Sequence, residues 1–239
     1  MEDISPHPLA DLPEGTKNPL DYALTQRDGS TLAMVRAAVA HNQTLMAYQP
    51  VMRDADDPKI AFYEGFIRIL DPTGRVIPAR EFMPVVEKTQ LGREIDVLSL
   101  NAGLAALSEN KGLRLSINMS ARSIGYAGWT TLLNRWLSRD GTIGERLILE
   151  ISEKSAMQMP ELVASFMDQL QTRGVCFALD NFGSDYIAIR YLKEMFFDIL
   201  KIDGQFARGV SDHPDNRAIV SIMVSIARNF DMITVAEQV

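Results

Sequence analysis

The sequence lacks the features on which several common kinds of site depend. It contains one cysteine, Cys176, so no disulfide can form within the chain, and a reducing, cytoplasmic compartment is expected. Its three histidines lie outside the strand-like segments, which leaves a histidine-rich zinc site or a Ser-His-Asp triad with little support. No apolar run approaches the ~20 residues that cross a membrane. The polar, proline-containing first residues do not have the pattern of a signal peptide.

Positive charge is also in short supply. The formal net charge is -7, which argues against non-specific binding to DNA or to an anionic membrane. An anionic ligand would therefore need a cation beside it, and a divalent metal is the natural candidate. With 46% hydrophobic and 23% charged residues the composition is globular, and 239 residues suit one large α/β barrel or two small domains.

Strand-like and helix-like segments alternate along most of the chain. Residues 1–29 hold several prolines and little periodicity, so we predict a tail or linker there, then a helix from Ser30 and one domain over residues 30–239. Short apolar runs predict strands at residues 45–51, 60–70, 113–120, 146–152, 175–181, 198–203 and 232–239. Helical periodicity predicts further helices at residues 79–89, 95–107, 129–137, 160–171, 186–195 and 215–230.

This alternation predicts an α/β fold built on a parallel sheet. A closed (β/α)8 barrel needs eight strands, whereas seven are predicted. The last strand and helix are therefore expected to be missing from this chain, which leaves the seventh strand with an unpaired edge. An open parallel sheet is the alternative.

Polar residues stand at or near the ends of most of these strands. They are Glu64, Asn118, Glu150, Asp180, Asn181, Lys201 and Glu237. In a barrel the C-terminal ends of the strands converge on one mouth, where active sites are built. Four carboxylates crowded there repel one another unless cations intervene, and oxygen ligands suit Mg²⁺, Mn²⁺ or Ca²⁺ better than zinc. Any one of these residues could instead be a solvated loop residue or a helix cap.

Seven short motifs, in order, resemble those of the EAL domain family of cyclic di-GMP phosphodiesterases. They are YQPV at 48–51, YEGFIR at 63–68, INMSAR at 117–122, LEISE at 149–153, LDNFGSDY at 179–186, LKID at 200–203 and VAEQV at 235–239. The resemblance runs from about residue 32 to residue 239. It implies a TIM-barrel variant whose first strand is antiparallel, and metal-dependent hydrolysis of one phosphodiester of cyclic di-GMP to give linear pGpG.

The resemblance also implies a role for each matching residue. The family's metal ligands correspond to Glu64, Asn118, Glu150, Asp180 and Asn181. Lys201 corresponds to the lysine that positions the attacking water, and Glu237 to a general base or second-metal ligand. Glu153 corresponds to a glutamate that braces the loop after the fifth strand. Gln49 and Arg68 correspond to residues that contact the ligand. Mg²⁺ or Mn²⁺ is the implied cofactor, with Ca²⁺ as an inhibitor.

Three departures from the family pattern bear on turnover. Asn181 stands where the family usually carries a second aspartate, so the side chain keeps a carbonyl oxygen but loses its charge. In the loop that follows, Asp185 replaces a glycine, and Ile187 and Ala188 replace two hydroxyl residues. The third departure is the absence of the family's last strand.

The sequence therefore leaves two classes of function open. One is a phosphodiesterase, active or impaired, and the other is a non-catalytic module that senses cyclic di-GMP or binds a protein partner. A homodimer is also open. An unrelated Mg²⁺-dependent barrel such as an enolase-type lyase fits the ligands but not the ordered motifs. Two single residues have structural alternatives, since Arg68 could form an ion pair with Glu64, and Gln49 could close a turn beside Pro50.

Overall fold

A single curled sheet organises the molecule. The computed structural model describes residues 19–53, 58–184 and 189–238. Its strands are β1 (Thr44–Met52), β2 (Ile60–Leu70), β3 (Val76–Pro78), β4 (Leu115–Asn118), β5 (Leu147–Ser152), β6 (Cys176–Phe182), β7 (Ile199–Ile202) and β8 (Ile233–Ala236). They are hydrogen-bonded in the order β1-β2-β4-β5-β6-β7-β8, with β3 paired to β2. β1 is antiparallel to β2, and the neighbouring pairs from β2–β4 to β7–β8 are parallel.

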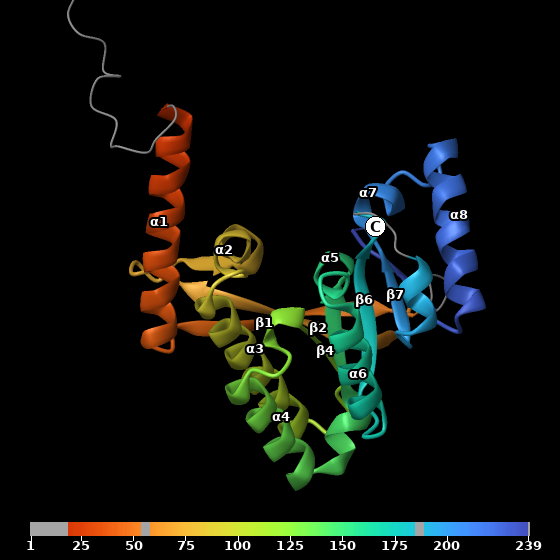
Figure 1. The fold of residues 1–239 in the computed structure, drawn as a ribbon, viewed down its shortest axis with the longest axis horizontal. Helices are drawn as coiled ribbons and strands as arrows, with labels where there is room; N and C mark the ends of the chain where they lie inside the picture. The colour runs from red at the N-terminus through yellow and green to blue at the C-terminus, as the bar shows by residue number, and fades with distance from the viewer. Residues whose placement is uncertain (1–18, 54–57, 185–188, 239) are drawn as a thin grey trace, which may run out of the picture.

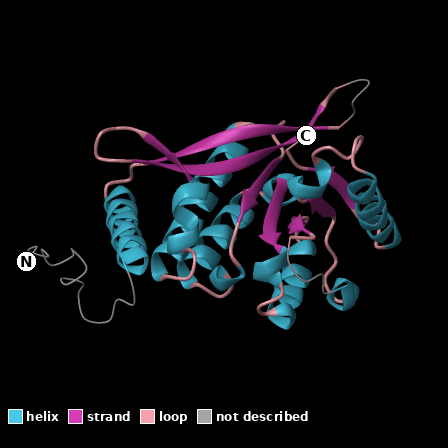
Figure 2. Cartoon of the chain, turned by 90° about the horizontal axis from the view of Figure 1, so that it is seen from above, coloured by secondary structure: helices cyan, strands magenta, loops and turns pink. Residues whose placement is uncertain are grey.

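Helices cover the outside of the curl. They are α1 (Pro19–Ala40), α2 (Ala79–Val86), α3 (Gln90–Glu109), α4 (Ala127–Arg139), α5 (Glu153–Ala156), α6 (Pro160–Gln171), α7 (Gly204–Ala207) and α8 (Pro214–Asn229), with 3-10 turns η2 (Ala121–Ser123), η3 (Gly141–Arg146) and η4 (Ile189–Lys193). In Figure 1, α1 and α2 lie at one end of the sheet and α7 and α8 at the other. Figure 2 shows the long β1–β2 hairpin across one side. Among the described helices, none is long and apolar enough to cross a membrane.

This architecture confirms the predicted α/β fold, a TIM-barrel-like half-barrel with an antiparallel first strand. The seven predicted strands correspond to β1, β2 and β4 to β8, and the short β3 was missed because three residues carry no periodicity. Within the described residues β8 pairs with β7 alone, so its outer edge is not covered by another strand.

Two helix predictions differ from the structure. The helix expected from Ser30 begins at Pro19, and residues 19–29 are helical rather than part of a tail. Leu20 in that stretch is 66% exposed, and the residues by which α1 packs against the core, from Leu32 to Val39, lie in its C-terminal half. Its first turns therefore lack the apolar periodicity that reveals a packed helix. Residues 1–18 lie outside the described part, and the domain boundary at residue 30 stays a prediction.

The helix expected over residues 186–195 is represented by the short 3-10 turn η4. Its buried apolar neighbours, Leu192, Met195 and Phe197, fall at i, i+3 and i+5, which is not the spacing of one helical stripe. Residues 185–188 lie outside the described part of the chain.

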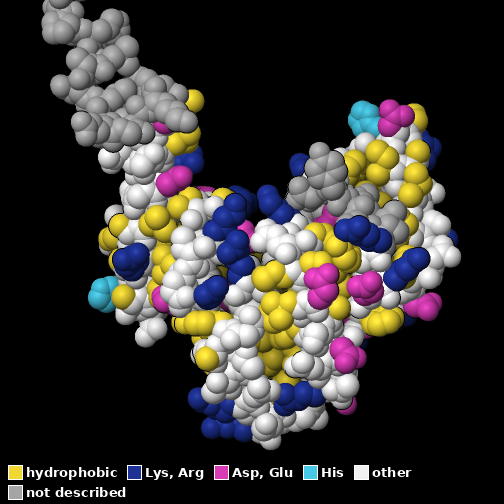
Figure 3. Space-filling view, in the orientation of Figure 1, with side chains coloured by type: hydrophobic (Ala, Val, Ile, Leu, Met, Phe, Trp, Pro, Cys, Tyr) yellow, Lys and Arg dark blue, Asp and Glu magenta, His cyan; other side chains and the backbone are white. Residues whose placement is uncertain are grey.

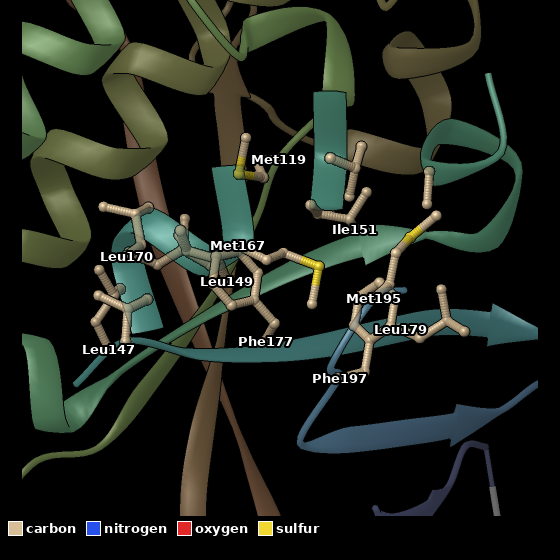
Figure 4. Packing of buried hydrophobic residues seen from close by; sticks show 14 of the residues in the cluster. Met119, Leu147, Leu149, Ile151, Met167, Leu170, Phe177, Leu179, Met195 and Phe197 are labelled. Carbon is tan, nitrogen blue, oxygen red and sulfur yellow. The ribbon is translucent and has the colours of Figure 1, made fainter. Parts of the chain in front are cut away.

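The main core lies between the sheet and the outer helices. Leu147, Leu149 and Phe177 from β5 and β6 point toward Met167 and Leu170 of α6 (Figure 4). Burial of each such side chain contributes about 1.5–3 kcal/mol. Because side chains alternate along a strand, a slip of one residue would turn this whole set away from the helices. The core therefore fixes which strand residues point into the curl.

Candidate active site

The polar residues predicted from the strand ends stand above an apolar floor inside the curl. Side chains at alternate positions share one face of a strand, and the residue two positions earlier is apolar in five strands. These floor residues are Phe62, Ile148, Ala178, Ile199 and Val235. The residues two positions further on are Glu64, Glu150, Asp180, Lys201 and Glu237. The same alternation that buries the floor therefore gathers one lysine and four carboxylates into a single layer.

The lysine of this layer lies within ion-pairing distance of all four carboxylates. Lys201 Nζ is 2.7 Å from Glu150 Oε2, 2.9 Å from Glu64 Oε2, 2.9 Å from Asp180 Oδ1 and 3.1 Å from Glu237 Oε1. The Lys201 side chain is only 2% exposed. Five strands that are distant in sequence thus meet at one ammonium group. The structure therefore brings together these five residues, as the strand-end pattern predicted.

Burial and charge act against each other in this cluster. Burial disfavours the ammonium, yet the attraction of Glu150, Asp180, Glu64 and Glu237 outweighs it and raises the pKa of Lys201 well above its usual value. Burial, opposed by Lys201, raises the pKa of Glu150 well above its usual range. Burial and then the charge of Asp180 raise the pKa of Glu237 to about 7. The single positive charge of Lys201 is thus too small to balance the four carboxylates.

The cluster has more oxygen acceptors than the lysine can serve. An ammonium has three N–H donors, and its hydrogen bonds go to Glu64 and Glu150. Glu150 Oε1 is buried without a hydrogen-bond partner, and Asp180 Oδ1 faces the ammonium as an ion pair without hydrogen-bond alignment. Spare buried carboxylate oxygens are the donor type that Mg²⁺ and Mn²⁺ prefer, so these residues fit a divalent cation.

The carboxylates are nevertheless not arranged around a metal position. No three His, Cys, Asp or Glu side chains in the described ranges are spaced to hold a metal ion. The physical reason is that their oxygens turn toward the Lys201 ammonium, which occupies the centre of the group. Binding a metal therefore requires carboxylate oxygens to rotate away from this lysine.

The two candidate amide ligands lie at the edge of the same layer. Asn118 Nδ2 donates to Glu64 Oε1 at 3.1 Å. Asn181 Nδ2 donates to Asp180 Oδ2. Asn181 has a φ of 56°, a left-handed conformation that asparagine and aspartate adopt more readily than most residues. Both amides thus contact carboxylates of the cluster, with a donor facing the acid in each case.

Glu153, which was predicted to brace the loop after β6, contacts the start of that loop. Glu153 is 1% exposed and its Oε2 accepts a hydrogen bond from the backbone N–H of Gly183 at 3.0 Å. This contact joins the start of α5 to the first residues after β6. Asp185, Ile187 and Ala188, which depart from the family pattern, lie outside the described residues.

A cavity of about 490 Å³ adjoins the cluster. It is lined by both residues that were predicted to contact the ligand, Gln49 and Arg68. Gln49 lies within β1, opposite Glu64, so the alternative that it closes a turn is wrong. The alternative ion pair of Arg68 with Glu64 is also wrong, because Glu64 bonds to Lys201 and Arg68 has no acid within 4.0 Å among the described residues. The Arg68 guanidinium instead lies 5.6 Å from the centre of the Phe66 ring.

Sequence reasoning missed two acids that line this cavity, Glu87 and the buried Asp96. Asp96 on α3 is 4% exposed, and its Oδ2 accepts hydrogen bonds from Ser120 N at 3.0 Å and Ser123 Oγ at 2.6 Å. Burial raises the pKa of Asp96 to about 7, against the opposing effect of these two hydrogen bonds. A signal was available, since Asp96 falls between Ile95, Ser99 and Leu100 on the buried face of the helix.

The fold and the site together define a TIM-barrel-like protein with an acidic site at the C-terminal ends of its strands. The EAL domain model matches residues 32–239, and the chain belongs to the EAL domain family.

Two relatives and one solved structure illustrate the similarity. The chain is 30% identical over 223 residues to the cyclic di-GMP phosphodiesterase PdeB of Shewanella oneidensis, covering 91% of this chain and 26% of the relative. It is 29% identical over 210 residues to the bifunctional diguanylate cyclase/cyclic di-GMP phosphodiesterase MucR of Pseudomonas aeruginosa, covering 86% and 30%. The solved PaMucR phosphodiesterase in complex with c-di-GMP shares 29% identity at a TM-score of 0.74, covering 88% of this chain and 87% of that chain. The chain thus spans less than a third of the length of the two relatives.

Replacing Lys201 tests whether the four acids form a cation site. Lys201→Met leaves them without their shared cation, and we expect the free energy of unfolding without metal to fall by about 3–5 kcal/mol. Mn²⁺ should stabilise this variant more than the wild type, because the competing ammonium is gone. Thermal unfolding with chelator and with Mn²⁺ measures both effects, with Lys154→Met, an exposed lysine on α5, as the control. Equal responses of the variant and the wild type to Mn²⁺ would contradict the cation site.

Asp96 makes the stability of the protein pH-dependent. Its pKa is raised from 3.8 to about 7 on folding, so its contribution to stability is complete below pH 3.8 and is lost as the pH rises through 7. Asp96→Asn removes this titration. As the pH rises from 3.8 to 7, the unfolding free energy of the variant should therefore increase by about 2–4 kcal/mol relative to that of the wild type. Urea unfolding across the range measures the difference, with Glu94→Gln on the same helix as control. Parallel pH profiles for wild type and Asp96→Asn would contradict it.

Proposed function

We propose that this chain is a cyclic di-GMP phosphodiesterase domain that uses Mg²⁺ or Mn²⁺ to hydrolyse one phosphodiester and release linear pGpG. The observation that carries the proposal is the Lys201 cluster, in which four acids present more oxygen acceptors than one ammonium can serve. The names of the relatives support the substrate. A dianionic substrate can enter so acidic a site only with additional cations.

Each residue of the layer has a task in this proposal. Glu64, Asn118, Glu150, Asp180 and Asn181 would hold the metal. When bound, the metal supplies positive charge to the reacting phosphate and activates water. Lys201 orients that water with its N–H donors. Glu237, whose carboxylate lies 3.1 Å from Nζ of the lysine, would accept the proton that the water loses as it attacks phosphorus. One P–O bond to a sugar breaks in the same step, and the sugar oxygen leaves as a hydroxyl that takes up this proton.

In this proposal the ligand binds in the cavity beside the cluster. Arg68 presents a guanidinium that can donate two parallel hydrogen bonds to one phosphate. Gln49 supplies a neutral amide for the sugar or base. Glu153 would keep the backbone after β6 in place through Gly183, and with it the strand end that carries Asp180, one of the residues that would hold the metal.

A second function, a non-catalytic receptor for cyclic di-GMP, is favoured by one observation. Asn181 is uncharged and its amide donor, not its oxygen, faces Asp180. A second metal at this position would find less negative charge and a competing donor. Such a protein would bind the nucleotide but hydrolyse it slowly. Protein partners, a homodimer and a cytoplasmic location remain proposals that accompany either function.

The decisive experiment is incubation of the protein with cyclic di-GMP and Mn²⁺ or Mg²⁺, followed by chromatography for pGpG. We expect product with Mn²⁺, and binding without turnover when Ca²⁺ replaces it, measured by calorimetry. Glu64→Gln, which weakens the metal site, should abolish product. Binding without product under any metal would favour the receptor. Neither binding nor product would contradict both functions and favour a module that docks a protein.

Restoring the missing charge at position 181 separates the two functions further. Asn181→Asp adds a unit charge about 4 Å from a metal, worth about 4 kcal/mol per unit of metal charge, before desolvation, at an effective dielectric of ~20. If ~3–4 kcal/mol survives desolvation, metal affinity should rise about 100- to 1000-fold. Aspartate tolerates the left-handed backbone there, so pGpG formation should rise too, and the wild type should depend more steeply on Mn²⁺.

The competing explanation of slow turnover assigns it to Asp185, Ile187 and Ala188 in the loop after β6. On that account Asn181→Asp binds metal more tightly but turns over no faster. Recovery of rate would then require glycine at position 185 and hydroxyl residues at positions 187 and 188. Metal titration and pGpG formation, measured on both sets of variants, distinguish the two explanations.

A further inference from the structure

The cavity beside the acidic cluster has positive charge at its other end. Glu64 and Arg68 lie on the same face of β2, four residues and therefore about 13 Å apart along the strand. Arg68 lines the cavity together with a second arginine, Arg80 of α2, whereas Asn118 and Asp180 line it from the cluster. Figure 3 shows Lys and Arg side chains gathered over the region of α2. The cavity thus joins an acidic end to an end with two arginines.

The β2–β3 hairpin brings the two arginines to the same end. Arg68 is paired directly with Pro78 across the antiparallel β2–β3 ladder. Helix α2 starts at the next residue, Ala79, so Arg80 lies two positions beyond the partner of Arg68. Their proximity is therefore a consequence of backbone pairing and does not depend on the side-chain rotamers.

The local structure of α2 does not explain why position 80 carries an arginine. It stands in the first turn of α2, where the helix dipole disfavours a cation. The Arg80 side chain is exposed. Among the described residues, neither Arg80 nor Arg68 has a carboxylate within 4.0 Å. Glu87 lines the same cavity but lies farther than this from both arginines. Two guanidinium groups without an acidic partner at one cavity are suited to an anion from outside the protein.

We propose that Arg80 is a ligand-positioning residue, which together with Arg68 binds the phosphate of cyclic di-GMP that is not cleaved. This inference rests on the proposed function. The ligand carries two phosphates on opposite sides of one ring, and the cluster around Lys201 can act on only one of them. The other phosphate then lies toward the arginine end, where planar guanidinium groups can donate paired hydrogen bonds. Arg80 accordingly selects ligands with two phosphates over simple diesters.

The test compares Arg80→Ala with Arg80→Lys and with Lys88→Ala, which removes an equal charge just after α2 but outside the cavity lining. Cyclic di-GMP binding is measured by calorimetry with Ca²⁺ at several salt concentrations. We expect Arg80→Ala to weaken binding about 10- to 100-fold, the loss of a charged hydrogen bond, and Arg80→Lys to recover part of it. Lys88→Ala should bind as the wild type does. Where turnover is measurable, KM should rise more than kcat falls.

A substrate with one phosphate supplies the internal control. Hydrolysis of bis(4-nitrophenyl) phosphate with Mn²⁺ involves the cluster alone, so its rate should be the same in Arg80→Ala and the wild type. Equal cyclic di-GMP affinity of Arg80→Ala, Lys88→Ala and the wild type would overturn the role of Arg80 and leave the proposed function intact. Equal losses on both substrates would also overturn it, since they would indicate a structural role. Absence of cyclic di-GMP binding by the wild type would overturn the proposed function, and this inference with it.

Discussion

The contact of one buried ammonium with four carboxylates is the interaction on which the site depends. Lys201 meets residues from β2, β5 and β6 and the residue just after β8, so the ends of these strands are held at one point. Burying such charges is costly unless they compensate one another, and here the compensation is incomplete because acids outnumber the base. This excess of acid is what supports the proposed binding of further cations, through which an anionic ligand would be held.

A second network, of hydrogen bonds rather than ion pairs, keeps this cluster in position. Asp96 on α3 accepts from Ser120 and Ser123, which follow β4. Ser155 of α5 accepts from the backbone N–H of Ala121 at 2.8 Å, and Glu153 of the same helix accepts from Gly183. These bonds run without a break from α3 through η2 to α5 and the loop after β6. The segments that follow β4, β5 and β6 are thus joined by buried hydrogen bonds, which fixes the strand ends that carry Asn118, Glu150 and Asp180.

The asparagine at position 181, where the family usually carries an aspartate, lowers the negative charge at one edge of this cluster. Asn181 sits at the end of β6, in a left-handed conformation, and contacts the same carboxylate that contacts the lysine. Compared with an aspartate, its neutral amide lowers the local negative charge and keeps only one side-chain oxygen. The arginines at the far end of the cavity are independent of this change, because they lie on β2 and α2. In the proposed function, binding of the nucleotide and its hydrolysis would therefore rest on different parts of the site.

The sequence by itself determined seven of the eight strands and the acidic layer, because alternation along a strand is a local property and the core residues Leu147, Leu149 and Phe177 dictate which neighbours point inward. It also contained the motifs of the family. Only the tertiary structure decided that Lys201 is the common partner of four acids, that Asp96 is buried, and that Arg68 and Arg80 share one cavity. It also decided that α1 begins at Pro19, where exposed turns leave no periodic signal. These features arise from residues distant in sequence, or from largely exposed helical turns, and neither leaves a period along the chain.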